Sequence, residues 1–206
     1  MSRLICLLLS SCLALFAPPS SAAVMPPDEL VKNVTLEVLD IVSTDKEIQA
    51  GNVEKVIGLV DAKVLPHFSF DSMTALAMGV NWRKATPEQK AKLIREFRTL
   101  LVRTYASAIT SYRDEKFEFL PLRAKPTDTD VTVNVRVLKS GRQPVAIDYD
   151  MEKTANGWKC YNMYVAGVSL VLNYRTEFTN EVRKSGIDGL IAVLEKKNKE
   201  LEAGAK

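Results

Sequence analysis

Three sets of side chains in this sequence have types and spacings that could support a reaction. His67 is the single histidine, and Cys160 is one of three cysteines, so either could serve as a base or a nucleophile. Asp148, Asp150 and Glu152 alternate along one segment, and a strand there would carry all three carboxylates on one face. Paired carboxylates of that kind can share general acid and base roles.

None of these sets predicts an active site. A Ser-His-Asp triad would have to use His67, and the sequence lacks a nucleophile elbow. A zinc site is implausible with one histidine and with Cys160 as the one cysteine outside the N-terminal leader, and no glycine-rich loop is spaced to hold a phosphate. Cys160 is expected to be a small buried filler on a strand, and the carboxylates are expected on a wet strand face. We therefore expect no enzyme, no metal and no cofactor, while a hydrolase working through His67 or Cys160 stays open as a weaker alternative.

Residues 1–22 have the pattern of a secretory signal peptide. Arg3 precedes a mostly apolar run at 4–16, and small residues at 20–23 allow cleavage after Ala22 or Ala23. The run is shorter than the ~20 residues that span a bilayer. Leu9 to Cys12 resembles a lipoprotein cleavage site, but apolar residues continue after Cys12, so ordinary cleavage is the expectation. We expect an exported chain that carries one domain over residues 23–206.

Removal of the signal peptide on export would also change the cysteine content and the net charge of the chain. Cys6 and Cys12 leave with the signal peptide, so Cys160 has no partner for an intramolecular disulfide. Removing Arg3 lowers the formal net charge from +3 to about +2, which is too balanced for nucleic-acid binding by bulk charge.

The part from about residue 26 to 113 has helical spacing of apolar residues. Helices are expected over 28–43, after the Gly51-Asn52 break, and after Asp71. The clearest start is at Thr86, where Pro87 and Gln89 complete a capping box. The apolar stripe that follows runs to Tyr112 and predicts a helix of about 26 residues.

Residues 115–165 switch to a period of two, which is typical of antiparallel strands with one apolar and one wet face. Ser140-Gly141 and Asn156-Gly157 supply turns. Helices are expected again over 168–203, with Gly186 as a break and with Ser185 and Asp188 starting the last helix. The resulting fold class is α+β, with a twisted, mostly antiparallel sheet of about four strands covered by long helices.

The segment at 157–178, GWKCYNMYVAGVSLVLNYRTEF, joins these parts. Strand alternation places Trp158, Cys160, Asn162 and Tyr164 on one face. Ser169 is expected to cap a following helix whose apolar stripe is Val171, Tyr174, Phe178 and Val182. Such a helix can lie back over the sheet and wall off an apolar space, and ordinary core packing of the same stripe is the alternative.

The same segment resembles the signature of the MlaC family, also called toluene-tolerance proteins. A second stretch at 68–106, FSFDSMTALAMGVNWRKATPEQKAKLIREFRTLLVRTYA, resembles the family's other characteristic region, in the same order. The resemblance implies a cystatin-like sheet of the nuclear-transport-factor type with a helical lobe. It also implies a soluble periplasmic carrier that binds a phospholipid and exchanges it with two assemblies, an outer-membrane lipoprotein–porin complex and an inner-membrane ABC transporter.

Such a carrier needs an apolar cavity for the acyl chains. Strand and helix periodicity give the predicted wall positions Phe97, Leu101, Tyr105, Val133, Val135, Ile147, Tyr149, Met151, Tyr164, Val165, Val168 and Leu172. Arg83, Lys84, Arg98 and Arg103 are candidates to meet a phosphate or an acidic partner. The alternative function is a periplasmic adaptor or scaffold with a filled core and no lipid cargo.

Overall fold

The computed structural model describes residues 24–138 and 141–204, so the predicted signal peptide at 1–22 lies outside the described residues. The strands form one antiparallel sheet with the order β1-β2-β3-β4-β5. The strands are β1 (Lys116–Phe119), β2 (Asp130–Leu138), β3 (Val145–Thr154), β4 (Gly157–Val165) and β5 (Val168–Ser169). The predicted α+β class is confirmed, with a short fifth strand at the edge beside the four expected from alternation.

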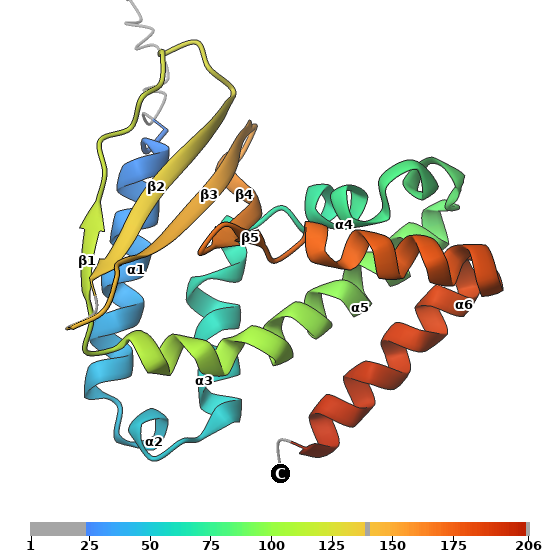
Figure 1. The fold of residues 1–206 in the computed structure, drawn as a ribbon, viewed down its shortest axis with the longest axis horizontal. Coiled ribbons are helices and arrows are strands. Elements are labelled where there is room, and N and C mark those ends of the chain that lie inside the picture. Colours follow the sequence, from blue (N-terminus) through green and yellow to red (C-terminus); the bar gives the residue numbers. More distant parts are fainter. Residues whose placement is uncertain (1–23, 139–140, 205–206) are drawn as a thin grey trace, which may run out of the picture.

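Helices account for most of the rest of the described chain. They are α1 (Pro27–Thr44), α2 (Lys46–Gln49), α3 (Val53–Lys63), α4 (Phe70–Met78), α5 (Pro87–Tyr105) and α6 (Arg175–Gly204). Four 3-10 segments join them: η1 (Leu65–His67), η2 (Gly79–Lys84), η3 (Ala106–Tyr112) and η4 (Leu172–Tyr174). In Figure 1, α1 and α3 lie beside the sheet, and α5 runs from there to a helical lobe formed with α4 and α6.

The strands are long because valine and other β-favouring residues alternate with polar ones. In β2 each of the four valines is buried and each residue between them is exposed, which fits a sheet with one covered face. The cross-strand pairs on the covered face join Val133 to Tyr149 and Val135 to Ile147. On the wet face, Asn134 Nδ2 donates to Asp148 Oδ1 at 2.7 Å.

A β-bulge in β4 changes which of its side chains face the covered side. The register places Met151 opposite Cys160 but Asp150 opposite Asn162, so Tyr161 is an extra residue in β4. Ile147 and Tyr149 then pair with Val165 and Met163 rather than with even-numbered residues. Strict alternation was therefore wrong for the second half of this strand, because one inserted residue reverses the faces that follow it.

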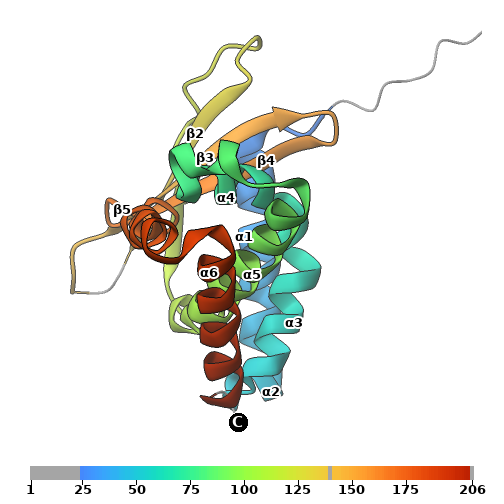
Figure 2. The same cartoon turned by 90° about the vertical axis from the view of Figure 1, so that its right-hand side faces the viewer.

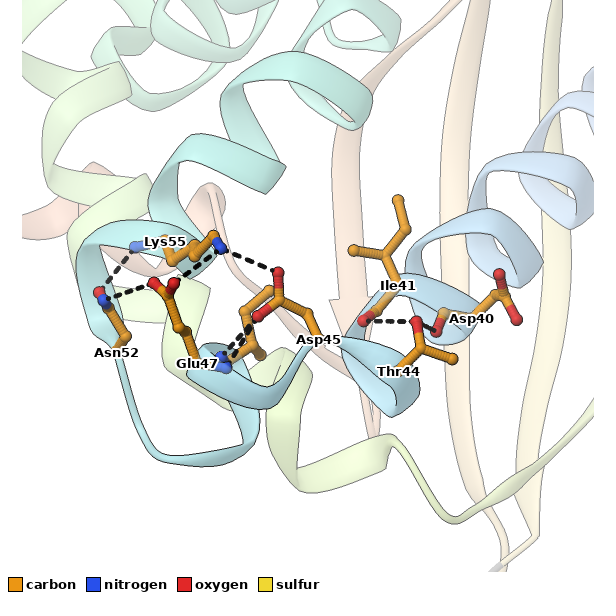
Figure 3. Close-up of polar contacts among 8 residues, drawn as sticks. Asp40, Ile41, Thr44, Asp45, Glu47, Asn52 and Lys55 are labelled. Atoms are coloured by element: carbon orange, nitrogen blue, oxygen red, sulfur yellow. Dashed lines mark hydrogen bonds and ion pairs between the residues drawn. The ribbon is translucent and has the colours of Figure 1, made fainter.

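The turn between α1 and α3 is built from side-chain caps (Figure 3). Asp45 Oδ1 accepts the backbone N–H groups of Glu47 and Ile48 at 2.9 and 3.2 Å, and Asn52 Oδ1 accepts that of Lys55 at 3.1 Å. The Lys55 ammonium lies 3.2 Å from Asp45 and 3.4 Å from Glu47. These hydrogen bonds and ion pairs hold the C-terminal end of α1 close to the N-terminal end of α3.

The capping box at Thr86 is confirmed, but the long helix that it begins is shorter than predicted. Gln89 N–H donates to Thr86 Oγ1 at 3.2 Å, and the Gln89 side chain accepts the Thr86 N–H at 3.1 Å. Helix α5 ends at Tyr105, and the apolar stripe continues as 3-10 turns in η3. Ser and Thr hydroxyls compete for backbone carbonyls there, and Thr110 Oγ1 donates to the Ser107 carbonyl at 2.7 Å.

Helix α6 does not lie over the sheet, so that expectation was wrong. Ser169 Oγ accepts from the N–H groups of Val171 and Leu172 at 3.2 and 2.9 Å, but these residues lie at the start of η4, and α6 begins only at Arg175. Helix α6 lies beside α5 instead (Figure 2), and Val171 and Phe178 are buried in one cluster with residues of α4 and α5. Gly186 breaks α6 with φ of 74°, a left-handed conformation that favours glycine.

The last helical segment does not start as the sequence predicted. The Ser185 hydroxyl donates back to the Glu181 carbonyl at 3.2 Å, and the Asp188 carboxylate accepts from Gln89 Nε2 at 2.9 Å. The break falls at Gly186 itself, so Ser185 is the end of one helix rather than the cap of the next.

Buried apolar side chains form three separate clusters. One fills the lobe of α4, α5 and α6 around Phe97 and Phe178. A second covers the sheet around Val133 and Val135, and a third joins α1, α2, α3 and the end of α5 around Val42. Because the clusters are packed within themselves, any internal space is expected at the seams between them.

Candidate cavity and its rim

A cavity of about 330 Å³ lies at the seam between the sheet cluster and the α1–α3 cluster. That volume lies within the ~300–1,000 Å³ of typical small-molecule pockets. Helix α1 forms one wall with Leu30, Val31, Val34, Thr35, Val38 and Leu39. The sheet forms the opposite wall with Phe117, Ile147, Tyr149, Met151, Cys160, Met163 and Val165.

The remaining boundary comes from turns around the ends of α3 and α5. Its lining residues are Val64, His67, Phe68, Tyr105, Ala108, Ile109, Tyr112 and Leu170. A second cavity of about 140 Å³ lies at the seam with the lobe cluster and is lined by Leu101 and Met73, among others. The two cavities share a boundary of Val64, Phe68, Tyr105, Ile109, Met163 and Leu170.

The main cavity is lined mostly by apolar side chains and has few polar groups. Aliphatic and aromatic side chains supply most of the wall, and such surfaces offer dispersion contacts without hydrogen bonds. Burial raises the pKa of the Tyr149 hydroxyl, although a hydrogen bond with Thr35 opposes this shift. On the sheet side, the wall therefore carries no side chain that is ionised near neutral pH.

Of the predicted wall positions, five line the main cavity: Tyr105, Ile147, Tyr149, Met151 and Val165. Leu101 and Tyr105 line the second cavity. Val133 and Val135 are buried in the sheet cluster without lining either space, because they belong to the packed layer of β2.

The other four predicted positions lie elsewhere. Phe97 is packed in the lobe, with its ring centroid 5.2 Å from those of Tyr174 and Phe178. Tyr164 follows the bulge and pairs with Asp148, on the wet face. Val168 lies in β5 with 56% of its surface exposed, and Leu172 lies in η4.

Sequence reasoning missed the α1 wall and Met163. A signal for α1 was present, since Val31, Val34 and Val38 recur at helical spacing, but an apolar stripe does not say whether it faces a core or a space. No alternation rule could have chosen Met163, because its orientation depends on the bulge at Tyr161.

The candidate reactive groups are placed in ways that do not activate them. The Cys160 thiol donates to the Asn162 carbonyl at 3.1 Å, and burial raises its pKa, whereas a nucleophilic thiol needs a lowered one. Asp150 accepts from Thr132 at 2.9 Å and from Asn162 at 3.1 Å. Among the described residues, no three histidine, cysteine, aspartate or glutamate side chains are grouped to hold a metal ion.

The basic residues proposed from sequence to meet a phosphate do not line either cavity. Arg98 pairs with Asp61 at 2.7 Å, and Arg103 lies 3.4 Å from both Glu54 and Glu202. His67 is different, because it lies in the wall of the main cavity and is half-buried. Burial lowers its pKa, nearby Lys159 lowers it further, and Glu37 acts in the opposite direction.

Comparisons with known proteins agree on one family. The family model described as MlaC protein matches residues 32–196. The chain is 24% identical over 172 residues to toluene tolerance protein ttg2D of Pseudomonas putida, covering 83% of this chain and 80% of that protein. It is 24% identical over 140 residues to the intermembrane phospholipid transport system binding protein MlaC of Haemophilus influenzae, covering 66% of this chain and 65% of that one.

A solved structure gives the same result. The phospholipid-binding protein of Ralstonia solanacearum, determined in complex with a phospholipid, superposes with a TM-score of 0.79 at 37% identity. The match covers 86% of this chain and 99% of the Ralstonia chain. Within residues 24–138 and 141–204, no helix combines the length and apolar character needed to cross a membrane.

Proposed function

This chain belongs to the MlaC family, and from that premise we propose that it binds a phospholipid with its acyl chains inside the cavity beneath α1. The observation that carries the proposal is the main cavity itself, an apolar space of about 330 Å³ between α1 and the sheet. An adaptor with a filled core would not need such a space, and a close relative in structure is named for binding this class of lipid.

The energetics favour a host of this kind. Each methylene removed from water contributes ~0.8 kcal/mol, so an acyl chain of about fourteen methylenes gains on the order of 11 kcal/mol when it is buried. Acyl chains make no hydrogen bonds, so a wall of valine, isoleucine, methionine and aromatic side chains is sufficient to hold them. The headgroup would stay near solvent.

We further propose that the protein works as a periplasmic carrier. It would take phospholipid from one membrane assembly and deliver it to another, namely an outer-membrane lipoprotein–porin complex and an inner-membrane ABC transporter. The relative named as part of an intermembrane phospholipid transport system supports this proposal. Sequencing the N-terminus of the exported protein tests the location, with cleavage expected after Ala22 or Ala23.

Solvent extraction of the purified protein followed by mass spectrometry tests the binding function. A carrier is expected to release phospholipid in a fixed molar ratio to protein, and a vesicle assay should show transfer of labelled phospholipid from donor to acceptor membranes. A protein that releases no lipid after gentle purification, and that moves none between vesicles, would contradict the proposal and favour the adaptor.

A further inference from the structure

One side chain in the wall of the main cavity can carry a positive charge. The lining is otherwise made of apolar residues, tyrosines, Thr35 and Cys160, none of which becomes cationic. His67 is also the single histidine of the whole sequence. The imidazole is half-buried at the edge of an apolar cavity, and burial disfavours its charged form.

The backbone around His67 is tied to β4. Phe68 forms a parallel bridge with Cys160, and the Ser69 N–H donates to the Cys160 carbonyl at 2.8 Å. Next to this bridge, the Lys159 ammonium donates to the Pro66 carbonyl. These contacts bring the Lys159 ammonium next to the turn that carries His67, close enough for its charge to act on the imidazole. His67 lines the cavity, whereas Lys159 lies outside the lining.

The charges around this edge leave Lys159 without a carboxylate partner. Glu37 of α1 faces His67, but its carboxylate is paired with Lys63 of α3 at 2.6 Å. Across the described parts of the chain, no ion pair joins Lys159 to an acidic side chain. Glu152 lies opposite Lys159 in the register of β3 and β4, but its carboxylate accepts the Ser72 hydroxyl at 2.6 Å. Neither Glu37 nor Glu152 is therefore ion-paired with Lys159.

We propose that His67 and Lys159 form a binding site for the phosphate of the bound phospholipid, at the rim of the cavity that takes its acyl chains. This rests on the proposed lipid-binding function and assigns it a headgroup contact. A phosphodiester is an anion with oxygen acceptors. It therefore complements an imidazolium and an ammonium better than it complements any other side chain in the wall. A neutral lipid with the same acyl chains lacks this contact.

The free protein and the loaded protein should differ in the ionisation of His67. Without lipid, burial and Lys159 both hold the pKa of His67 below its ordinary value, despite Glu37. A phosphate placed beside the ring favours the imidazolium and raises this pKa. Lys63 and Lys159 are the other cations near this edge, and neither can produce a rise on lipid binding.

The single histidine makes the test direct, because untagged protein gives one imidazole C2 proton signal. We would titrate this signal by proton NMR in delipidated protein, in protein loaded with phosphatidylglycerol, and in protein loaded with diacylglycerol of the same chains. Phosphatidylglycerol should raise the His67 pKa by about one unit, a tenfold shift in the protonation equilibrium, and diacylglycerol should not raise it. Equal pKa values with both lipids would overturn the proposal.

Two further comparisons are needed. One distinguishes a lipid phosphate from free inorganic phosphate, and the other distinguishes failure of the rim assignment from failure of the proposed function. Excess inorganic phosphate alone should leave the His67 pKa of empty protein nearly unchanged, and a rise equal to that with phosphatidylglycerol would indicate a free-phosphate site and overturn the headgroup assignment. If wild-type protein takes up neither lipid, the proposed function fails as well. If it takes up both and His67 titrates identically, only the rim assignment fails.

Substitution of Lys159 gives an independent readout. Lys159→Met should lower the preference for phosphatidylglycerol over diacylglycerol about 3- to 10-fold, as expected for one charge-assisted contact at a partly exposed site. Lys153→Met is the matched control, since Lys153 is an exposed lysine on the neighbouring strand β3, whereas Lys159 donates to the Pro66 carbonyl next to His67. An unchanged preference in Lys159→Met, or the same loss in Lys153→Met, would refute the role of Lys159.

Discussion

Ile147 and Val135 face each other across β3 and β2, but only Ile147 lines the main cavity. Val135 is 1% exposed within the packed sheet cluster. Tryptophan at these two positions should therefore act differently. Ile147→Trp would extend an indole into the space proposed for acyl chains, whereas Val135→Trp would force the same ring into a layer that is already full.

The magnitudes follow from those surroundings. An indole in place of the Ile147 side chain would displace roughly four methylenes of bound lipid, which at ~0.8 kcal/mol each weakens binding by about 3 kcal/mol. That loss corresponds to about 150-fold in affinity. Overpacking at Val135 should lower the free energy of unfolding by ~1–3 kcal/mol, while Ile147→Trp should change it by less than about 1 kcal/mol.

Two measurements on each variant decide the matter. Urea denaturation of delipidated protein gives the free energy of unfolding, and competition with a fluorescent fatty acid gives lipid affinity. The reasoning is refuted if Ile147→Trp destabilises the fold as much as Val135→Trp and binds lipid like the wild type. That result would mean that the ring repacks the sheet rather than occupying the cavity.

Three other perturbations test other parts of the account. Phe97→Ala, in the packed lobe and away from both cavities, should lower the free energy of unfolding by ~3–5 kcal/mol in urea melts, and a loss under 1 kcal/mol would mean that the lobe is loosely packed. Ser169→Ala removes the acceptor for two backbone N–H groups and the donor to Asn162, so it should cost about 1–2 kcal/mol in the same assay, while a neutral result would contradict a stabilising role for these hydrogen bonds. Lys55→Met should lower thermal stability at pH 7. In the folded protein the pKa of Asp45 is held below its ordinary value, first by the Ile48 N–H and then by Lys55. The ionised Asp45 carboxylate therefore stabilises the fold fully above its unfolded pKa of ~3.9, and this stabilisation is lost as the pH falls through the folded pKa of Asp45. The difference between Lys55→Met and wild type should therefore vanish in strong acid, and a difference that persists there would rule out the Asp45 contact.

Local rules predicted those elements whose causes are local. The capping box at Thr86 sets the start of α5, the glycine at 186 sets the break in α6, and the valine alternation sets β2. Each depends on residues within one turn or one strand, so the sequence alone specifies it.

The features that shape the cavity are not local in this way. Helix α6 packs on α5 rather than on the sheet because the lobe offers Phe97 and Leu93 as partners, and this choice depends on residues about eighty positions away. The bulge at Tyr161 appears only in the register between β3 and β4. Periodicity separates an apolar face from a wet one, but it cannot show whether two apolar faces meet fully or leave a seam between them.

The central claim is that acyl chains lie between α1 and strands β3 and β4. A phospholipid with a photoreactive group near the end of one acyl chain tests this most directly, because irradiation of the loaded protein marks the residues that touch the tail. The account predicts labelled peptides that contain Val34 or Val38 of α1 and Ile147 or Met163 of the sheet. Labelling confined to exposed residues such as Val80, or to the packed lobe around Phe178, would contradict it.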